Sequence, residues 1–335
     1  MNNFWRPISV DTSNYCLPDK WQEAERLEYR RLGKTELKVS VVSYGAAPLG
    51  NEYRQIDISE GIRSLHLALD LGVNFIDTSP YYGRTKSESV LGQGLAQIDR
   101  NRYYLATKVG RYDLDEFDFS ADRVAQSIDK SLQRLGVDYL DLIQCHDIEF
   151  GNLDQVVNET IPALQKAKQQ GKVRFIGITG LPLKIFCYIL DRIEVDTILS
   201  YCHYSLNDTA LEDLIPYLET KDVGIISASP LSMRLLTNLG PPDWHPSDDE
   251  TKQVCAQVAA HCRCQGGDLA ELGMQFSLAN PKIHSTLMGT ANPDNVRKNI
   301  DCLTSTYDAN LLAEVQEMLK PIHNRTWISG YPENN

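Results

Sequence analysis

The sequence has no long apolar run and no excess of basic residues. It carries 33 Lys and Arg against 45 Asp and Glu, which gives a formal net charge of −12 at pH 7. Such a chain lacks the basic surface that neutralises nucleic-acid phosphates or anionic lipids. No segment approaches the ~18 apolar residues that span a bilayer. The first residues, MNNFWRPISVDTSNY, lack the apolar core of a signal peptide. We therefore expect a cytoplasmic protein that binds neither nucleic acid nor membrane.

The cysteines show no regular framework of paired spacings. They are Cys16, Cys145, Cys187, Cys202, Cys255, Cys262, Cys264 and Cys302. In a chain of this size without a secretion signal we expect free thiols. The cluster around His261 lies on one predicted helix without a second pair at zinc-finger spacing, so we predict no metal site. Cys145 and His146 are neighbours on a predicted strand and point to opposite faces, so we expect Cys145 to be a core residue.

Apolar strand-like runs alternate with amphipathic stretches along the chain. Strands are predicted at 39–44, 74–76, 104–107, 140–144, 175–178, 197–200, 224–227 and 285–288, and helices at positions including 59–71, 121–135, 154–170 and 208–220. Eight strand-then-helix units favour a (β/α)8 TIM barrel over a doubly wound sheet. No GxGxxG motif follows a strand, because Gly92-Gln-Gly94 falls within a predicted helix and lacks the third glycine.

The two ends of the chain suggest additions to this barrel. Residues 27–39, LEYRRLGKTELKV, are typical of a β-hairpin around Gly33 and Lys34, which would plug the bottom of the barrel. Extra helices are expected towards the C-terminus. We expect one barrel domain over residues 27–335, preceded by a loose arm over residues 1–26.

Three predicted strands in succession end in an ionisable residue: Asp77, Lys108 and His146. Active sites of barrels form at the carboxyl ends of the strands, so these side chains should converge, together with a tyrosine from the adjoining FIDTSPYYG segment (75–83). An ammonium beside a phenol favours the phenolate and lowers its pKa, and an imidazole can stabilise a developing oxyanion. These groups suit proton transfer coupled to carbonyl or alcohol redox chemistry. Tyr82 would be the general acid/base, Lys108 would tune it, Asp77 would hold the lysine, and His146 would orient the substrate oxygen.

FIDTSPYYG, ATKVG and QCHD resemble the aspartate, tyrosine, lysine and histidine motifs of the aldo-keto reductases. These are NAD(P)-dependent oxidoreductases built on a (β/α)8 barrel. The family spacing places the tyrosine five residues after the aspartate and before a glycine, which selects Tyr82 over Tyr81. The resemblance extends from about Leu27 to Tyr331.

A narrower resemblance concerns segments such as HDIEFGNLDQ, RFIGITGLPL, LSYCHYSLND and GPPDWHP, which are similar to those of plant L-galactose dehydrogenases. That group oxidises C1 of L-galactose to the lactone with NAD, in a route to ascorbate. The resemblance implies the sugar substrate. Related dehydrogenases for L-fucose or D-arabinose, a general aldo-keto reductase, and a nucleotide-binding regulatory subunit without turnover are the alternatives. The oligomeric state is left open.

The resemblance also implies an extended dinucleotide across the barrel mouth. The matching positions are Gly45, Ala46, Asp77, Thr179, Ser200, Ser229, Pro230, Leu231, Ser232, Gly289, Thr290, Asn295 and Asn299. NADP-preferring members carry cations where this chain has Gly289 and Asn295, and such cations bind the 2′-phosphate strongly. We therefore expect NAD, with NADP as the alternative because Arg297 and Lys298 are close by.

The sugar pocket is expected to combine Tyr82 and His146 with other polar or aromatic residues of the strand ends and loops. A buried hydroxyl without a hydrogen-bond partner costs about 1–3 kcal/mol, so a polyol needs several partners. The candidates are Asp147, Tyr53, Tyr112, His203 and Trp244. The alternative for each is a structural or exposed role.

Overall fold

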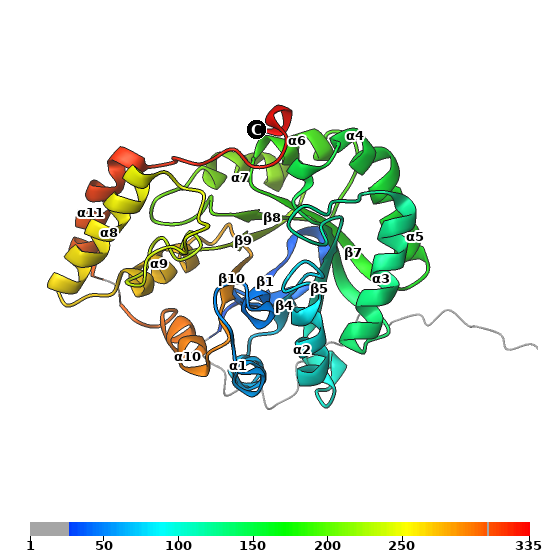
Figure 1. The fold of residues 1–335 in the computed structure, drawn as a ribbon, viewed down its shortest axis with the longest axis horizontal. Helices are drawn as coiled ribbons and strands as arrows, with labels where there is room; N and C mark the ends of the chain where they lie inside the picture. Colours follow the sequence, from blue (N-terminus) through cyan, green and yellow to red (C-terminus); the bar gives the residue numbers. More distant parts are fainter. Residues whose placement is uncertain (1–26, 307) are drawn as a thin grey trace, which may run out of the picture.

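A computed structural model describes residues 27–306 and 308–335, and the expected arm over residues 1–26 lies outside this part of the chain. Eight parallel strands close a barrel in the order β10-β3-β4-β5-β6-β7-β8-β9, surrounded by helices (Figure 1). The strands are β3 (Val42–Gly45), β4 (Phe75–Asp77), β5 (Tyr104–Val109), β6 (Leu140–Cys145), β7 (Val173–Gly180), β8 (Thr197–Tyr201), β9 (Gly224–Ala228) and β10 (Ser285–Gly289). The predicted (β/α)8 fold is confirmed.

The first predicted strand, 39–44, is wrong as a single element. It covers the end of β2 (Lys38–Ser40) and most of β3, which are separated at Val41. β2 pairs antiparallel with β1 (Tyr29–Arg31) in a two-stranded sheet outside the barrel, with Arg30 opposite Val39. The apolar run is continuous because both elements are buried, so hydrophobicity alone does not mark the break.

The hairpin closes the barrel at the amino ends of its strands. Leu32, Leu37 and Val39 are buried in one cluster with inward-facing strand residues such as Phe75. Gly33 has φ +53°, and a Cβ there would lie 2.2 Å from the backbone nitrogen of Gly224. Only glycine fits this close approach. The hairpin therefore fills the barrel floor and leaves the carboxyl ends of the strands free for a site.

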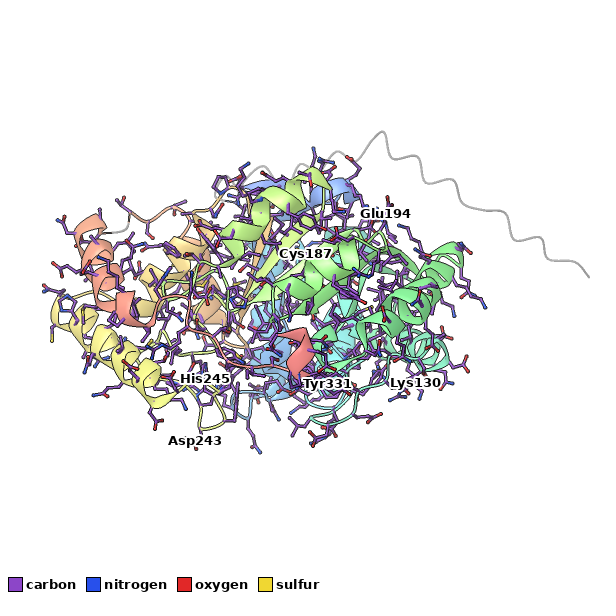
Figure 2. All side chains as sticks on the ribbon, turned by 90° about the horizontal axis from the view of Figure 1, so that it is seen from above. Lys130, Cys187, Glu194, Asp243, His245 and Tyr331 are labelled. Atoms are coloured by element: carbon purple, nitrogen blue, oxygen red, sulfur yellow. The ribbon has the colours of Figure 1, made fainter. Side chains whose placement is uncertain are left out.

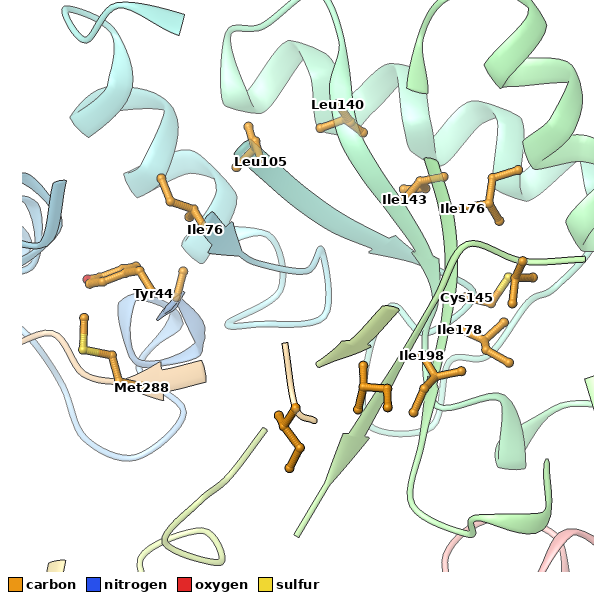
Figure 3. Packing of buried hydrophobic residues seen from close by; sticks show 14 of the residues in the cluster. Tyr44, Ile76, Leu105, Leu140, Ile143, Cys145, Ile176, Ile178, Ile198 and Met288 are labelled. Atoms are coloured by element: carbon orange, nitrogen blue, oxygen red, sulfur yellow. The ribbon is translucent and has the colours of Figure 1, made fainter. Parts of the chain in front are cut away.

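The outer faces of the strands pack against the surrounding helices. These helices are α1 (Ile58–Asp70), α2 (Lys86–Leu95), α3 (Ala121–Leu135), α5 (Ile161–Gln169), α6 (Lys184–Leu190), α7 (Leu211–Thr220), α9 (Leu269–Leu278) and α10 (Pro293–Asp301). On β6, Ile143 and Cys145 belong to this outer cluster (Figure 3), and Leu142 belongs to the interior cluster. Cys145 is thus a core residue, and burial raises the pKa of its thiol to about 12.

The helix predicted over 154–170 is interrupted in the structure. It consists of α4 (Leu153–Gln155), a π-helical turn (Val156–Thr160) and α5. Pro162, at the start of α5, has no N–H to continue a regular ladder. A wider turn before a proline is a common response to this missing donor.

Two further helices, α8 (Asp249–Cys264) and α11 (Ala309–Leu319), lie side by side at one flank of the barrel (Figure 1). They share a second apolar cluster with α9 that contains Val258, Leu272 and Val315. Asp243, His245 and Tyr331, from the loop before α8 and from the tail, lie along one edge of the molecule, and Glu194 lies near the opposite edge (Figure 2). No helix within the described residues is long and apolar enough to cross a membrane.

Candidate active site

A buried polar layer lies inside the barrel at the carboxyl ends of β4, β5 and β6. Lys108 Nζ donates hydrogen bonds to Asp77 Oδ1 and, at 2.8 Å, to the carbonyl of Thr78. Gln144 is the register partner of Lys108 and donates to Asp77 Oδ2 at 2.7 Å. All three side chains are almost inaccessible to solvent. The ion pair is thus enclosed and further hydrogen-bonded, as buried charges require.

Tyr82 and His146 lie above this layer. Tyr82 Oη is 3.3 Å from Lys108 Nζ, and its ring meets the His146 imidazole edge-on, with 5.7 Å between centroids. Tyr81 also contacts the imidazole, at 5.8 Å. Ser79 Oγ lies 3.0 Å from His146 Nδ1. The two tyrosines therefore have different places: Tyr82 reaches the lysine, and Tyr81 forms a wall beside the histidine.

Asp147 follows the histidine and carries a second ion pair. Arg111 Nη1 donates to Asp147 Oδ2 at 2.5 Å, and Thr179 Oγ1 donates to Oδ1 at 3.2 Å. The Arg111 guanidinium stacks on the Tyr81 ring, 3.9 Å from its centroid. Asp147 Oδ2 lies 3.7 Å from His146 Nε2. The carboxylate of Asp147 is thus engaged with both Arg111 and the hydroxyl of Thr179.

Burial keeps the two proton-handling side chains neutral. Burial, followed by the nearby carboxylate of Asp77, raises the pKa of Tyr82 well above its ordinary value. Lys108 favours the phenolate, but Asp77 offsets its effect and the desolvation of the phenol is the larger cause, so the net shift of this pKa is upward. Burial also lowers the pKa of His146 to about 3. The site therefore holds a phenol and a neutral imidazole above a compensated ion pair.

The loop before α8 reaches the mouth of the barrel. Trp244 packs against Tyr53, with 5.9 Å between ring centroids. Tyr53 is one of the groups that raise the pKa of Tyr82, so it lies near the Tyr82 phenol. Trp244 is 53% exposed, which leaves one side of its indole open. These two predicted substrate residues are therefore brought together beside the site.

Two other predicted substrate residues lie elsewhere. The Tyr112 ring lies beneath the Arg123 guanidinium of α3, 4.0 Å from it, because the chain turns at Gly110 (φ +99°) and successive residues point to opposite sides. Arg111 takes the inward position instead. His203 Nδ1 contacts the Asp208 carboxylate at 3.2 Å and is buried. Tyr112 therefore packs against α3, and His203 Nδ1 is engaged with Asp208.

The predicted cofactor residues gather at neighbouring strand ends. Gly45 pairs with Asp77 on one side and with Gly289 on the other, and Ala46 donates its N–H to the Asp77 carbonyl at 2.8 Å. Asn295 and Asn299 lie on α10, which begins four residues after Gly289. Thr290 Oγ1 accepts from the Asn292 N–H at 3.1 Å and so shapes the turn into α10.

Loop 229–234 follows β9 in an unusual conformation. Ser229, Ser232, Met233 and Arg234 all have positive φ, which is uncommon for residues other than glycine. Ser232 Oγ donates to Asn207 Oδ1 at 2.7 Å, so its hydroxyl is used within the protein. The loop also contains Pro230 and Leu231, which complete the predicted segment. Arg234 Nε is buried without a hydrogen-bond partner.

Ser200 does not fit its predicted contact with the nicotinamide. Its neighbour Leu199 belongs to the interior cluster and Ile198 to the outer one. Strand alternation therefore directs Ser200 outward with Ile198. Tyr201 takes the inward position, and its Oη lies 3.2 Å from Glu149 Oε1.

Several residues of the site are not among those predicted from the sequence. Gln144 and Ser79 lie two residues before His146 and two after Asp77, so the alternation of a strand and its continuation could have found them. Arg111 and Tyr201 point inward. Each has a sequence neighbour of similar character, so the sequence does not show which of the two residues enters the site. Glu149 is wholly buried in a segment that sequence features predict to be a loop.

Among the described cysteines all are free, and the described residues form no cluster of three or more metal-ligand side chains.

A (β/α)8 barrel with a Lys–Asp pair, a tyrosine and a neutral histidine at its carboxyl end defines an oxidoreductase of alcohols and carbonyls. The aldo/keto reductase family model matches residues 41–320, so the chain belongs to the aldo/keto reductase family.

Relatives and solved structures agree with this assignment. The L-galactose dehydrogenase of Arabidopsis thaliana is 52% identical over 92% of this chain and 99% of that protein. The D-arabinose 1-dehydrogenase of Saccharomyces cerevisiae is 30% identical over 88% of this chain and 95% of that protein. The holo form of an aldo-keto reductase from Bacillus halodurans superposes with a TM-score of 0.74 at 26% identity, covering 92% of this chain and 99% of that one.

Proposed function

We propose that this protein is an NAD-dependent aldose 1-dehydrogenase that oxidises L-galactose at C1 to the lactone. The observation that carries the proposal is the arrangement of Tyr82, Lys108, Asp77 and His146 at the barrel mouth. The likeness to L-galactose dehydrogenase over almost the whole chain supports the choice of sugar.

In this proposal the C1 oxygen of the sugar lies between Tyr82 and His146. Tyr82 takes the C1 hydroxyl proton during oxidation, and His146 donates a hydrogen bond to the oxygen as its character changes from hydroxyl to carbonyl. Lys108, which is paired with Asp77, stabilises the phenolate form of Tyr82. Arg111 and Asp147 form a polar wall, stacked on the Tyr81 ring, that can meet the ring hydroxyls.

The residues present fit a nicotinamide dinucleotide, which would supply the acceptor for the hydride that leaves C1. Gly289 leaves space at the end of β10, since a Cβ there would lie 3.8 Å from the nearest atom of Pro48, whereas a Cβ at the neighbouring Gly45 would lie 3.3 Å from the Met288 carbonyl oxygen. The loop with Ser229, Pro230 and Leu231 and the start of α10 follow the seventh and eighth barrel strands, where barrels frequently bind phosphate. The unpaired Nε of Arg234 suits an anionic group there.

NAD is proposed over NADP because Gly289 and Asn295 carry no charge where NADP-preferring members have cations. Arg297 and Lys298 are exposed on α10.

The test is a set of parallel assays of L-galactose, L-fucose and D-arabinose, each with NAD and with NADP. We expect L-galactose with NAD to give the largest kcat/KM. Stoichiometric nucleotide binding without turnover of any aldose would contradict the proposal and support a regulatory subunit instead.

Tyr82→Phe tests the catalytic role within the same assays. General acid/base groups contribute about 10²–10⁴-fold to rate, so kcat should fall by that order while nucleotide binding persists. Tyr81→Phe is the matched control, because it removes an adjacent phenol hydroxyl and leaves the ring that stacks on Arg111. A loss in Tyr81→Phe as large as in Tyr82→Phe would show that the roles are misassigned.

A further inference from the structure

The hydrogen-bond partners of Ser79 determine which nitrogen of His146 carries the proton. Ser79 Oγ accepts the backbone N–H of Tyr81 at 3.1 Å and lies 3.0 Å from His146 Nδ1. These two contacts are the hydrogen bonds of Ser79 Oγ among the described residues, and Ser79 is wholly buried.

A serine hydroxyl has one proton to donate. If His146 Nδ1 carried the imidazole proton, both Tyr81 N–H and Nδ1–H would donate to Ser79 Oγ. The Ser79 hydroxyl proton would then be buried without an acceptor, which is unfavourable. If Ser79 donates to Nδ1 instead, every polar group in this cluster is satisfied.

The other imidazole nitrogen faces the site. His146 Nε2 lies 3.7 Å from Asp147 Oδ2, which is too far for a good hydrogen bond. A neutral imidazole has a single N–H, and burial keeps His146 neutral. The position of that one proton therefore decides whether the imidazole can donate to a substrate oxygen.

We propose that Ser79 is a positioning residue that fixes His146 as the Nε2–H tautomer and so aims its only N–H at the substrate oxygen. The inference rests on the proposed function for the substrate oxygen, but the tautomer is a property of the protein alone. Ser79 lies in the turn between catalytic Asp77 and Tyr82, so one short segment supplies the base, the lysine's partner and the group that orients the histidine.

The experiment measures the His146 tautomer by long-range ¹H–¹⁵N correlation spectra of ¹⁵N-labelled protein, with His146→Asn used to assign the signals. The wild type should show a protonated Nε2 and an unprotonated Nδ1. Ser79→Ala should change the tautomer ratio by about fivefold, the effect of losing one hydrogen bond. It should also lower kcat, by up to about fivefold, with a smaller change in KM, because a bond to a developing oxyanion strengthens in the transition state. Ser79→Thr, which keeps a hydroxyl, should retain the wild-type tautomer.

Ser64→Ala is the matched control. Ser64 is an equally buried serine on α1, and its hydroxyl contacts Tyr44 and the carbonyl of Gly61 away from the site. It should leave both the tautomer and kcat unchanged. A proton on Nδ1 in the wild type, or an unchanged tautomer ratio in Ser79→Ala, would overturn the proposal. Failure of every aldose to react would overturn the proposed function and leave the tautomer result valid.

Discussion

Burial has opposite effects on the pKa values of Tyr82 and His146, and both effects favour the neutral form. Desolvation raises the pKa of the phenol and lowers that of the imidazole to about 3. In the protein without ligands, the base for alcohol oxidation is therefore a minor species at neutral pH. The nearby Lys108 ammonium, 3.3 Å from Tyr82 Oη, favours this species and is itself offset by Asp77.

The pH dependence of sugar oxidation follows from these shifts. Since the pKa of Tyr82 lies above its ordinary value near 10, the phenolate fraction increases about tenfold per pH unit below that pKa. We expect kcat/KM for oxidation to rise from about pH 7 to about pH 9 without a second limb from His146, whose pKa of about 3 lies far below this range.

Initial rates in buffers of constant ionic strength would measure this profile. The residual activity of Tyr82→Phe is the control and should lose the slope, because the titrating phenol is gone. A kcat/KM that is flat or falls over the same range in the wild type would contradict Tyr82 as the base.

A site residue could be predicted from the sequence where the sequence determines the direction in which its side chain points. Asp77, Lys108 and His146 were found because each stands at the end of a buried strand, where side-chain direction is set by the strand. Past the strand end, this rule fails. At Gly110 the turn exchanges the expected directions, so Arg111 enters the site and Tyr112 packs under α3.

At the scale of the elements, the loop after β9 and the turn from β10 into α10 form the proposed cofactor edge. Asn292 caps α10 by accepting from the N–H groups of Asp294 and Asn295. The side chain of Asn295 is exposed. A substitution there changes surface charge near the turn without breaking the cap.

Cofactor choice should respond to charge at this edge. Gly289→Lys combined with Asn295→Arg should lower the KM for NADP by about 10- to 100-fold, because hydrogen bonds to a charged group contribute roughly 1.5–3 kcal/mol. The KM for NAD should change much less. Steady-state kinetics with both cofactors measure the ratio.

Asn310→Arg is the matched control for added charge. Asn310 is exposed near the start of α11, and its N–H is capped by Asp308 as that of Asn295 is by Asn292. It should leave cofactor preference unchanged. If the double variant gains nothing with NADP, the adenosine end lies elsewhere.

The existence of the barrel strands was predicted well, and some boundaries between elements were predicted less well. The barrel strands were found as apolar runs between helical stretches, because a parallel sheet covered on both faces reads as continuous hydrophobicity. The same continuity hid the boundary between β2 and β3 at Val41. The π-helical turn before Pro162 depends on a local hydrogen-bond adjustment that periodicity cannot show.

At the scale of the whole molecule, the C-terminal tail is joined to the barrel mouth through Glu149. Its Oε1 accepts from Ser329 Oγ at 3.0 Å and from the Leu181 N–H at 3.1 Å, and its carbonyl accepts from the Tyr331 N–H at 2.9 Å. A Cβ at Gly330 would lie 2.2 Å from that carbonyl oxygen. Sequence alone could not predict this joint, since its partners are separated by about half the chain.

The buried carboxyl of Glu149 makes the stability of this joint depend on pH. Burial, followed by the neighbouring Asp147 carboxylate, raises its pKa to about 8 from an ordinary value of 4.5, and its Oε2 has no hydrogen-bond partner. Between these two values the folded protein holds a proton that the unfolded chain has released. The free energy of unfolding therefore falls as pH rises through this range, by about 1.4 kcal/mol per pH unit from this group.

Glu149→Gln removes the ionisable group and keeps an oxygen that can accept the same hydrogen bonds. The variant should gain stability relative to the wild type as pH increases from about 5 to about 8, by several kcal/mol at most. Urea unfolding at a series of pH values measures this difference, in which the contribution of His146 cancels because both proteins contain it. Glu333→Gln, an exposed acid in the same tail, should give a difference that does not change with pH. A Glu149→Gln difference that is equally independent of pH would show that Glu149 ionises in the folded protein as it does in the unfolded chain.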